Sequence, residues 1–179
     1  MSDASGPESD CGRVGVAAAL FTPSERSAHM AKRILVAVDG STEARDALAF
    51  AASEWPDAEL TALHVINPAD SATGADGGFP GAADQWYDSA KQRGERILTE
   101  ATAAVDRDIE TRLEVGRPTA TILGVAGGEK RVGDDDDPGE PFDHVVLASQ
   151  GRTGLSRVLL GSVAEGVVRR SEVPVTVVR

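Results

Sequence analysis

A glycine-rich stretch near the end of the chain holds the residues whose types and spacing best suit binding chemistry. Gly151, Arg152 and Gly154 follow an apolar run at residues 142–149, and a Gly–Ser pair comes at residues 161–162. When a buried strand opens into a glycine-rich loop and the chain then enters a helix, several backbone N–H groups gather at one place. Such a cluster, beside the positive end of a helix dipole, is typical of a phosphate-binding site.

The pattern of apolar residues predicts strands and helices that alternate along the chain. Strands are expected at residues 33–38, 60–66, 109–115, 142–149 and 173–178. Helices are expected at residues 41–55, 83–105, 116–126 and 158–170. This alternation predicts an α/β fold, a single doubly wound five-stranded parallel sheet with helices on both faces.

Two loops of this fold are expected to meet at one edge of the sheet. Asp39, Gly40 and Ser41 end the first predicted strand, and the glycine-rich loop ends the fourth. Ligands of doubly wound sheets bind beyond the carboxyl ends of the strands, where the strand order reverses. If the first and fourth strands are neighbours, the two loops face one crevice.

Two segments differ in composition from the rest of the chain, whose predicted domain spans residues 30–179. Residues 1–29 are polar and turn-rich at their start, which predicts a disordered extension, and we expect Met30 to be the natural start. Residues 127–141 form a polar insertion with four consecutive aspartates at residues 134–137. This acidic run suits either a solvated segment or a cation site, and the composition favours the solvated segment.

Charge and composition limit the function classes. The net charge is −11, and only three of the 18 basic residues are lysines. This balance favours a halophilic surface over that of an ordinary acidic protein, and it makes duplex nucleic acid a poor partner. No apolar run is long enough to cross a bilayer, and Cys11 is the only cysteine, so we expect a cytoplasmic protein without internal disulfides.

The sequence contains no group of residues that demands catalysis. The Gly-x-x-x-x-Gly-Lys-Ser/Thr pattern of P-loop ATPases and the nucleophile elbow of α/β-hydrolases are both missing. His64 falls within a predicted strand, which predicts a packed or hydrogen-bonded side chain, and His144 has no partner at metal-ligand spacing. The chain is therefore expected to bind a ligand rather than to transform one.

Four motifs in order resemble the universal stress protein family. They are the segments at residues 38–41, 64–65, 116–118 and 151–162, which read Val-Asp-Gly-Ser, His-Val, Gly-Arg-Pro and Gly-Arg-Thr-Gly-Leu-Ser followed by Gly-Ser. The resemblance covers about residues 32–179, apart from the acidic insertion. It implies a Rossmann-like domain of the adenine-nucleotide-binding type and a homodimer formed through the last strand, residues 173–178. It also implies that some members bind ATP and others bind no nucleotide.

One position departs from the ATP-binding branch of this family. The phosphate motif of that branch begins with a glycine, and Ala148 stands in its place, whereas Gly151, Gly161 and Ser162 fit the rest. A position that needs a left-handed backbone or a close approach to phosphate would make alanine unfavourable by about 1 kcal/mol or more. An ordinary strand position would tolerate the methyl group.

The resemblance also implies roles for single residues. Asp39 would accept hydrogen bonds from ribose hydroxyls, or alternatively cap the first helix, and Val65 would hold adenine through its main chain while packing in the core. Phosphates would be cradled by Gly151, Gly161 and Ser162, which could equally shape the loop and cap the helix. The remaining candidate cofactor-binding residues are Gly40, Ser41, Ala148, Arg152, Gly154 and Val163. Arg152 and Arg157 could add charge near phosphate or pair with the acidic surface.

The function expected from these observations is ATP binding, with Mg²⁺, by a stress-response sensor or switch that signals to an unidentified partner. A nucleotide-independent dimer would share every core feature and would differ only at the phosphate loop. A slow ATP-hydrolysing or self-phosphorylating enzyme would need a metal and a positioned base, for which Asp39 is the available carboxylate.

Overall fold

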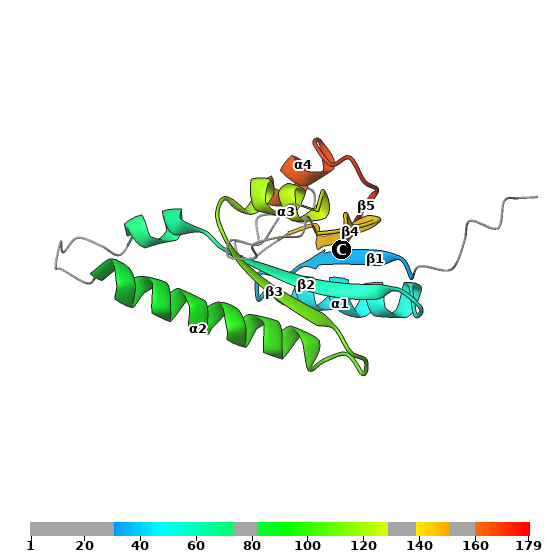
Figure 1. Cartoon of the computed structure of the whole chain (residues 1–179), viewed down its shortest axis with the longest axis horizontal. Helices are drawn as coiled ribbons and strands as arrows, with labels where there is room; N and C mark the ends of the chain where they lie inside the picture. Colours follow the sequence, from blue (N-terminus) through cyan, green and yellow to red (C-terminus); the bar gives the residue numbers. More distant parts are fainter. Residues whose placement is uncertain (1–30, 74–81, 129–138, 151–159) are drawn as a thin grey trace, which may run out of the picture. The chain divides into compact units, whose positions relative to one another are not determined.

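The described residues of the computed structural model form one parallel sheet with helices on both faces (Figure 1). They comprise residues 31–73, 82–128, 139–150 and 160–179, all within the unit Ala31–Arg179. The sheet order is β3-β2-β1-β4-β5, and the strands are β1 (Arg33–Ala37), β2 (Glu59–Ile66), β3 (Glu110–Val115), β4 (His144–Ala148) and β5 (Val175–Val178). The predicted doubly wound α/β class is confirmed.

Two pairs of helices cover the sheet. One face carries α1 (Thr42–Glu54) and α2 (Ala82–Thr102), and the other carries α3 (Pro118–Ala126) and α4 (Ser162–Val168). A short 3₁₀ helix, η1 (Pro68–Thr73), follows β2. Strand β1 is buried on both faces, with Ile34, Leu35 and Val36 each 0% exposed, as expected for a central parallel strand.

Helix α1 shows how the sequence positions the first loop. Ser41 is its N-cap residue and its hydroxyl oxygen accepts a hydrogen bond of 3.1 Å from the Ala44 amide. The helical spacing of apolar residues predicts an inner face of Ala44, Ala47, Leu48, Ala51 and Trp55. The first four are buried on α1, whereas Trp55 is its C-cap residue and only partly buried. The cap therefore fixes where the chain leaves β1 and enters the helix.

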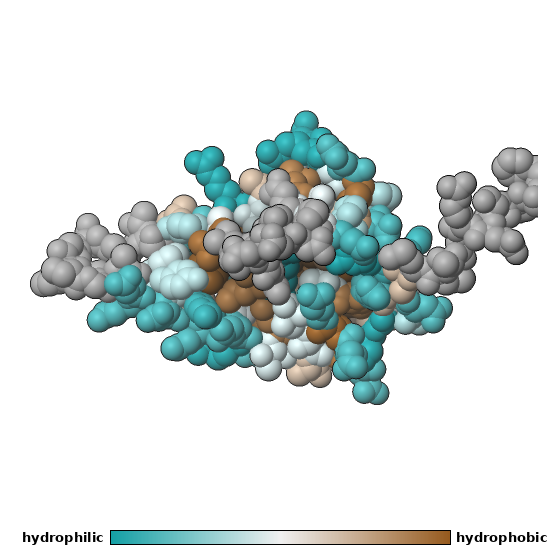
Figure 2. Space-filling model, in the orientation of Figure 1, coloured by the Kyte–Doolittle hydropathy of each residue, from teal (hydrophilic) through white to brown (hydrophobic). Residues whose placement is uncertain are grey.

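Helix α2 is amphipathic, as its spacing predicts. Ala90, Leu98 and Ala101 are buried, whereas its outward face is hydrophilic (Figure 2). Gly94 is also buried, and a Cβ atom there would lie 2.6 Å from a Leu113 methyl group. The missing side chain therefore lets α2 lie close to β2 and β3.

Some predicted boundaries were wrong at the carboxyl-terminal half. Helix α4 begins at Ser162 rather than at residue 158, because Gly161 is the N-cap residue with extended backbone (φ −63°, ψ 153°). Strand β4 begins at His144 rather than at residue 142, and β5 begins at Val175 rather than at residue 173. Before β5, the Ser171 hydroxyl bonds both the carbonyl and the amide of Val173, which makes a tight turn instead of strand.

The strand order places the carboxyl ends of β1 and β4 side by side. Strand β1 lies between β2 and β4, and Ala37 is in register with Leu63 on one side and Leu147 on the other. The segments that follow β1 and β4 therefore leave the sheet at the same edge. The condition for a shared crevice, that the first and fourth strands are neighbours, is met.

The two ends of the acidic insertion lie beside each other. The Phe142 amide donates a 2.9 Å hydrogen bond to the Ala126 carbonyl, and Gly128, at φ +84°, lies against Gly139. The four aspartates at residues 134–137 and the predicted extension at residues 1–29 lie outside the described residues. None of the helices in the described part of the chain combines the length and apolar character that a membrane span requires.

Candidate functional site

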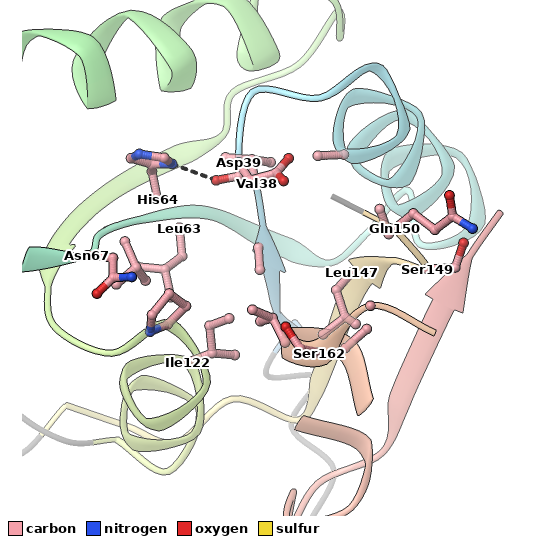
Figure 3. A pocket seen from close by; sticks show the side chains of 18 of the residues that line it. Val38, Asp39, Leu63, His64, Asn67, Ile122, Leu147, Ser149, Gln150 and Ser162 are labelled. Atoms are coloured by element: carbon pink, nitrogen blue, oxygen red, sulfur yellow. Dashed lines mark hydrogen bonds between the residues drawn. The ribbon is translucent and has the colours of Figure 1, made fainter. Parts of the chain in front are cut away.

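A cavity of about 260 Å³ opens at the carboxyl ends of β1, β2 and β4 (Figure 3). Its polar lining residues are Asp39, His64, Asn67, Asp70, Ser149, Gln150 and Ser162. Its other lining residues are Ala37, Val38, Ala44, Leu63, Val65, Pro118, Ile122, Leu147, Ala148, Gly161, Val163 and Ala164. The cavity thus lies where ligands bind in doubly wound folds.

Asp39 lines this cavity and is held from the side of α1. One of its carboxylate oxygens, Oδ1, accepts hydrogen bonds from the Ser41 amide at 3.0 Å and from the Ser41 hydroxyl at 2.6 Å. Because Ser41 is the N-cap residue, Asp39 does not cap α1 itself. Gly40 lies between them at φ +89°, a conformation that glycine adopts without strain. Gly40 and Ser41 support the carboxylate and do not line the cavity.

The start of α4 forms another part of the wall. Ser162 and Val163 line the cavity at the first turn of the helix, where backbone N–H groups have no partner within the helix. Gly161 also lines it, but its amide donates a 2.7 Å hydrogen bond to the Ser149 carbonyl. The Gly161 N–H is therefore used to join β4 to α4 in this structure.

Ala148, which replaces the first motif glycine, is an ordinary strand residue. It is the last residue of β4 and is in register with Val178 of β5. The next residue continues this ladder, since the Ser149 amide donates to the Val178 carbonyl at 2.7 Å. The backbone at Ala148 needs no left-handed conformation, so alanine causes no strain there.

The cavity has a distinct apolar region beside β2 and α3. Val65 and Leu63 from β2 and Ile122 from α3 line it. In Figure 3, Asn67 lies at this side, Ser149 and Gln150 lie at the other, and Asp39 lies between them. Asn67 also organises η1, because its side-chain oxygen accepts from the Ala69 amide at 3.2 Å and its side-chain amide donates to Asp70 at 3.3 Å.

The charge of the cavity is unfavourable for a bare anion. Its described lining includes the carboxylates of Asp39 and Asp70 and no lysine or arginine. A phosphate group bound here would need a compensating cation. The predicted site residues Gly151, Arg152 and Gly154, as well as Arg157, lie outside the described residues.

The structure adds residues that the sequence interpretation missed. Ser149 and Gln150 directly follow β4, as Val38 and Asp39 directly follow β1, so the rule about carboxyl ends could have identified them. Asn67 and Asp70 fall in a segment interpreted only as a loop. The same rule, applied to the end of β2, points to this segment.

The histidines behave as structural residues. His64 is 8% exposed and its Nδ1 lies 2.7 Å from the Val38 carbonyl oxygen, which confirms the predicted hydrogen-bonded role. His144 Nε2 lies 2.8 Å from the Thr176 hydroxyl, and its ring packs against Trp55 with centroids 5.0 Å apart. The described residues contain no group of three or more His, Cys, Asp or Glu side chains placed to hold a metal ion.

Comparisons with known proteins agree with this architecture. The sequence profile of the universal stress protein family matches residues 30–130 and 139–179, leaving out most of the acidic insertion. A Staphylococcus saprophyticus protein named as a universal stress protein is 34% identical over 155 residues, which cover 83% of each chain.

Solved structures share the fold. The structure of the hypothetical protein MJ0577 has a TM-score of 0.59 and 28% identity, with 83% of this chain and 96% of that chain covered. Universal stress protein UspA from Lactobacillus plantarum has a TM-score of 0.56 and 25% identity, with 83% and 97% covered. This chain belongs to the universal stress protein family.

Proposed function

We propose that the chain binds ATP in the cavity between β1 and β4 and acts as a sensor or switch in a stress response. The observation that carries the proposal is the single cavity shared by Asp39, the apolar wall of β2 and α3, and the start of α4. Small-molecule sites commonly combine an apolar wall with a few polar groups in this way. The family resemblance, in which some members bind ATP, supports the same ligand.

The cavity offers different chemistry to each part of ATP. Val65, Leu63 and Ile122 provide apolar surface for the flat face of adenine. Asp39, between the two sides, provides a carboxylate that accepts hydrogen bonds from ribose hydroxyls. Ser162 and Val163 provide a hydroxyl and helix-start amides for phosphate. Gly151, Arg152 and Gly154 are proposed to complete the phosphate end.

Mg²⁺ is part of the proposed ligand. The described lining carries two carboxylates and no basic side chain, so a bare triphosphate would meet net repulsion there. Mg²⁺ is usually held by substrate phosphates together with one or two carboxylates. ATP is therefore expected to bind more tightly as its magnesium complex than as the free anion.

We further propose a homodimer formed through residues 173–178. Strand β5 lies at one edge of the sheet, and all four of its residues are half-buried rather than fully buried. An apolar edge strand is a natural surface for pairing with a second copy. Sedimentation equilibrium in molar KCl should give a dimer mass, whereas a monomer mass at micromolar concentration would contradict this assembly.

Isothermal titration calorimetry of the full chain with MgATP in molar KCl tests ATP binding. We expect saturable binding that Asp39→Asn weakens by roughly tenfold, as for loss of a charge-assisted hydrogen bond. Asp46→Asn, an exposed position on α1, changes the charge equally and should leave the affinity unchanged. No heat at millimolar ATP from folded, nucleotide-free protein would contradict the proposal and favour the nucleotide-independent dimer.

A further inference from the structure

We propose that His64 is a positioning residue that holds Asp39 in place for the ribose of the nucleotide. This inference rests on the proposed function, since it concerns how the same cavity recognises the ribose of its ligand. The side chain of His64 contributes by contacting the main chain of Val38, the residue before Asp39. Its role is thus separate from the apolar wall and from the phosphate end.

The contact between His64 and β1 is specific. His64 is 8% exposed, and its Nδ1 lies 2.7 Å from the carbonyl oxygen of Val38 (Figure 3). A carbonyl oxygen only accepts hydrogen bonds, so Nδ1 carries the proton and donates it. Val38 directly precedes Asp39, and its carbonyl belongs to the peptide that joins the two residues. The imidazole therefore fixes the plane of the peptide from which Asp39 projects.

The same turn is held from two further sides. The Val38 amide donates a 2.8 Å hydrogen bond to the Leu63 carbonyl, which continues the pairing of β1 with β2. Ile97 of α2 packs against Gly40, where an added Cβ atom would lie 3.1 Å from Ile97 Cγ1. The segment from Val38 to Gly40 thus has restricted freedom on both sides of the Asp39 side chain.

Helix α2 sets where the His64 ring lies. A Cβ atom added at Gly94 would lie 3.0 Å from His64 Cδ2, so the bare glycine backbone faces the ring closely. The ring is therefore confined between α2 and the Val38 carbonyl. None of the described residues of α2 lines the cavity, so the position of this helix reaches Asp39 indirectly, through the His64 ring on one side and through Ile97 against Gly40 on the other.

The test compares two ligands and two substitutions in the full chain. The ligands are MgATP and its 2′,3′-dideoxy analogue, which lacks the hydroxyls that Asp39 is proposed to bind. In His64→Asn the side-chain nitrogen is bonded to Cγ, as Nδ1 is in histidine, so the donor is kept. In His64→Leu the volume is similar and the donor is lost. Thermal melting gives the folded fraction of each variant at the titration temperature.

We expect the wild-type chain to prefer ATP over the dideoxy analogue by roughly tenfold. His64→Leu should lose most of this preference by weakening ATP binding alone, and His64→Asn should keep most of it. If His64→Leu does not fold, His64→Gln decides, because its amide lies one bond farther from the backbone and should reduce the preference partly.

The possible failures are distinguishable. A wild-type chain that binds neither nucleotide would overturn the proposed function and this inference with it. A wild-type chain that binds both equally would overturn the inference while ATP binding stands. If His64→Leu lost affinity for both ligands equally, or if every folded His64 variant kept the full preference for ATP over the dideoxy analogue, His64 would only support the fold. Either result would overturn this inference and leave the proposed ATP binding in place.

Discussion

Replacement of Ala148 by glycine tests whether the departure from the family's phosphate motif matters. The substitution restores the glycine that the ATP-binding branch has at this position. In the structure, however, Ala148 is in register with Val178 at the end of β4 and needs no special backbone conformation. We therefore expect Ala148→Gly to change the affinity for MgATP by less than about threefold, well under the tenfold effect of one lost hydrogen bond.

The same substitution should lower stability by a small, measurable amount. Glycine inside a strand loses more backbone freedom on folding than alanine, which costs roughly 0.5–1 kcal/mol. Ala148 is half-buried against the core beneath α1, so its methyl group adds at most about 0.8 kcal/mol. A total of about 1 kcal/mol corresponds to a fall in Tm of about 3 °C for a domain of this size.

Ala37→Gly is the matched control. Ala37 ends β1, lines the same cavity and is also half-buried, but it occupies no position of the phosphate motif. Calorimetry and thermal melting of both variants should give similar losses of Tm and little change in affinity. A gain in affinity of tenfold or more in Ala148→Gly alone would refute the reasoning, because the methyl group would then obstruct the phosphate.

Three other predictions concern the cap of α1, the ionisation of His144 and the net charge. Ser41→Ala should lower Tm by about 3 °C, because a helix cap worth about 1 kcal/mol is lost, and it should weaken MgATP binding because Asp39 loses its hydrogen bond from the Ser41 hydroxyl. The control Ser53→Ala, near the end of α1, should change neither Tm nor affinity. An unchanged Tm in Ser41→Ala would contradict the capping role. Burial, aided by the charge of Lys32, lowers the pKa of His144 below its ordinary value of 6.5. The unfolded chain therefore binds this proton more readily, so stability should fall as the pH drops below about 6.5, and urea titrations of His144→Gln should show a flatter pH dependence. Because the net charge is −11, Tm should rise between about 0.1 M and about 2 M KCl as self-repulsion is screened, and a falling Tm would contradict the halophilic interpretation.

The fold was largely predictable because each local signal agreed with the others. The apolar run at β1, the cap at Ser41 and the helical spacing of Ala44, Ala47, Leu48 and Ala51 all indicated a strand followed by an inward-facing helix, and the structure has both. The start of α4 was predicted wrongly because apolar spacing continued upstream of Gly161. Periodicity does not show that the backbone at Gly161 is extended and joined to β4.

The candidate site was predictable where its residues end strands and hidden where they depend on packing. Asp39 could be placed at the crevice because it follows a buried strand. The contact of His64 with Val38 depends on the pairing of β2 with β1, which the sequence does not state. Asn67 and Asp70 reach the cavity at the start of a 3₁₀ turn after β2, and the spacing of apolar residues does not reveal such a turn.

A crystal structure of the full chain grown with MgATP, at a concentration that saturates the calorimetric titration, tests the central proposal most directly. We predict nucleotide density in the cavity between β1 and β4, with a ribose hydroxyl within hydrogen-bond distance of Asp39 and the base against Val65 and Ile122. Nucleotide bound elsewhere, or an empty cavity under saturating conditions, would contradict the proposed site.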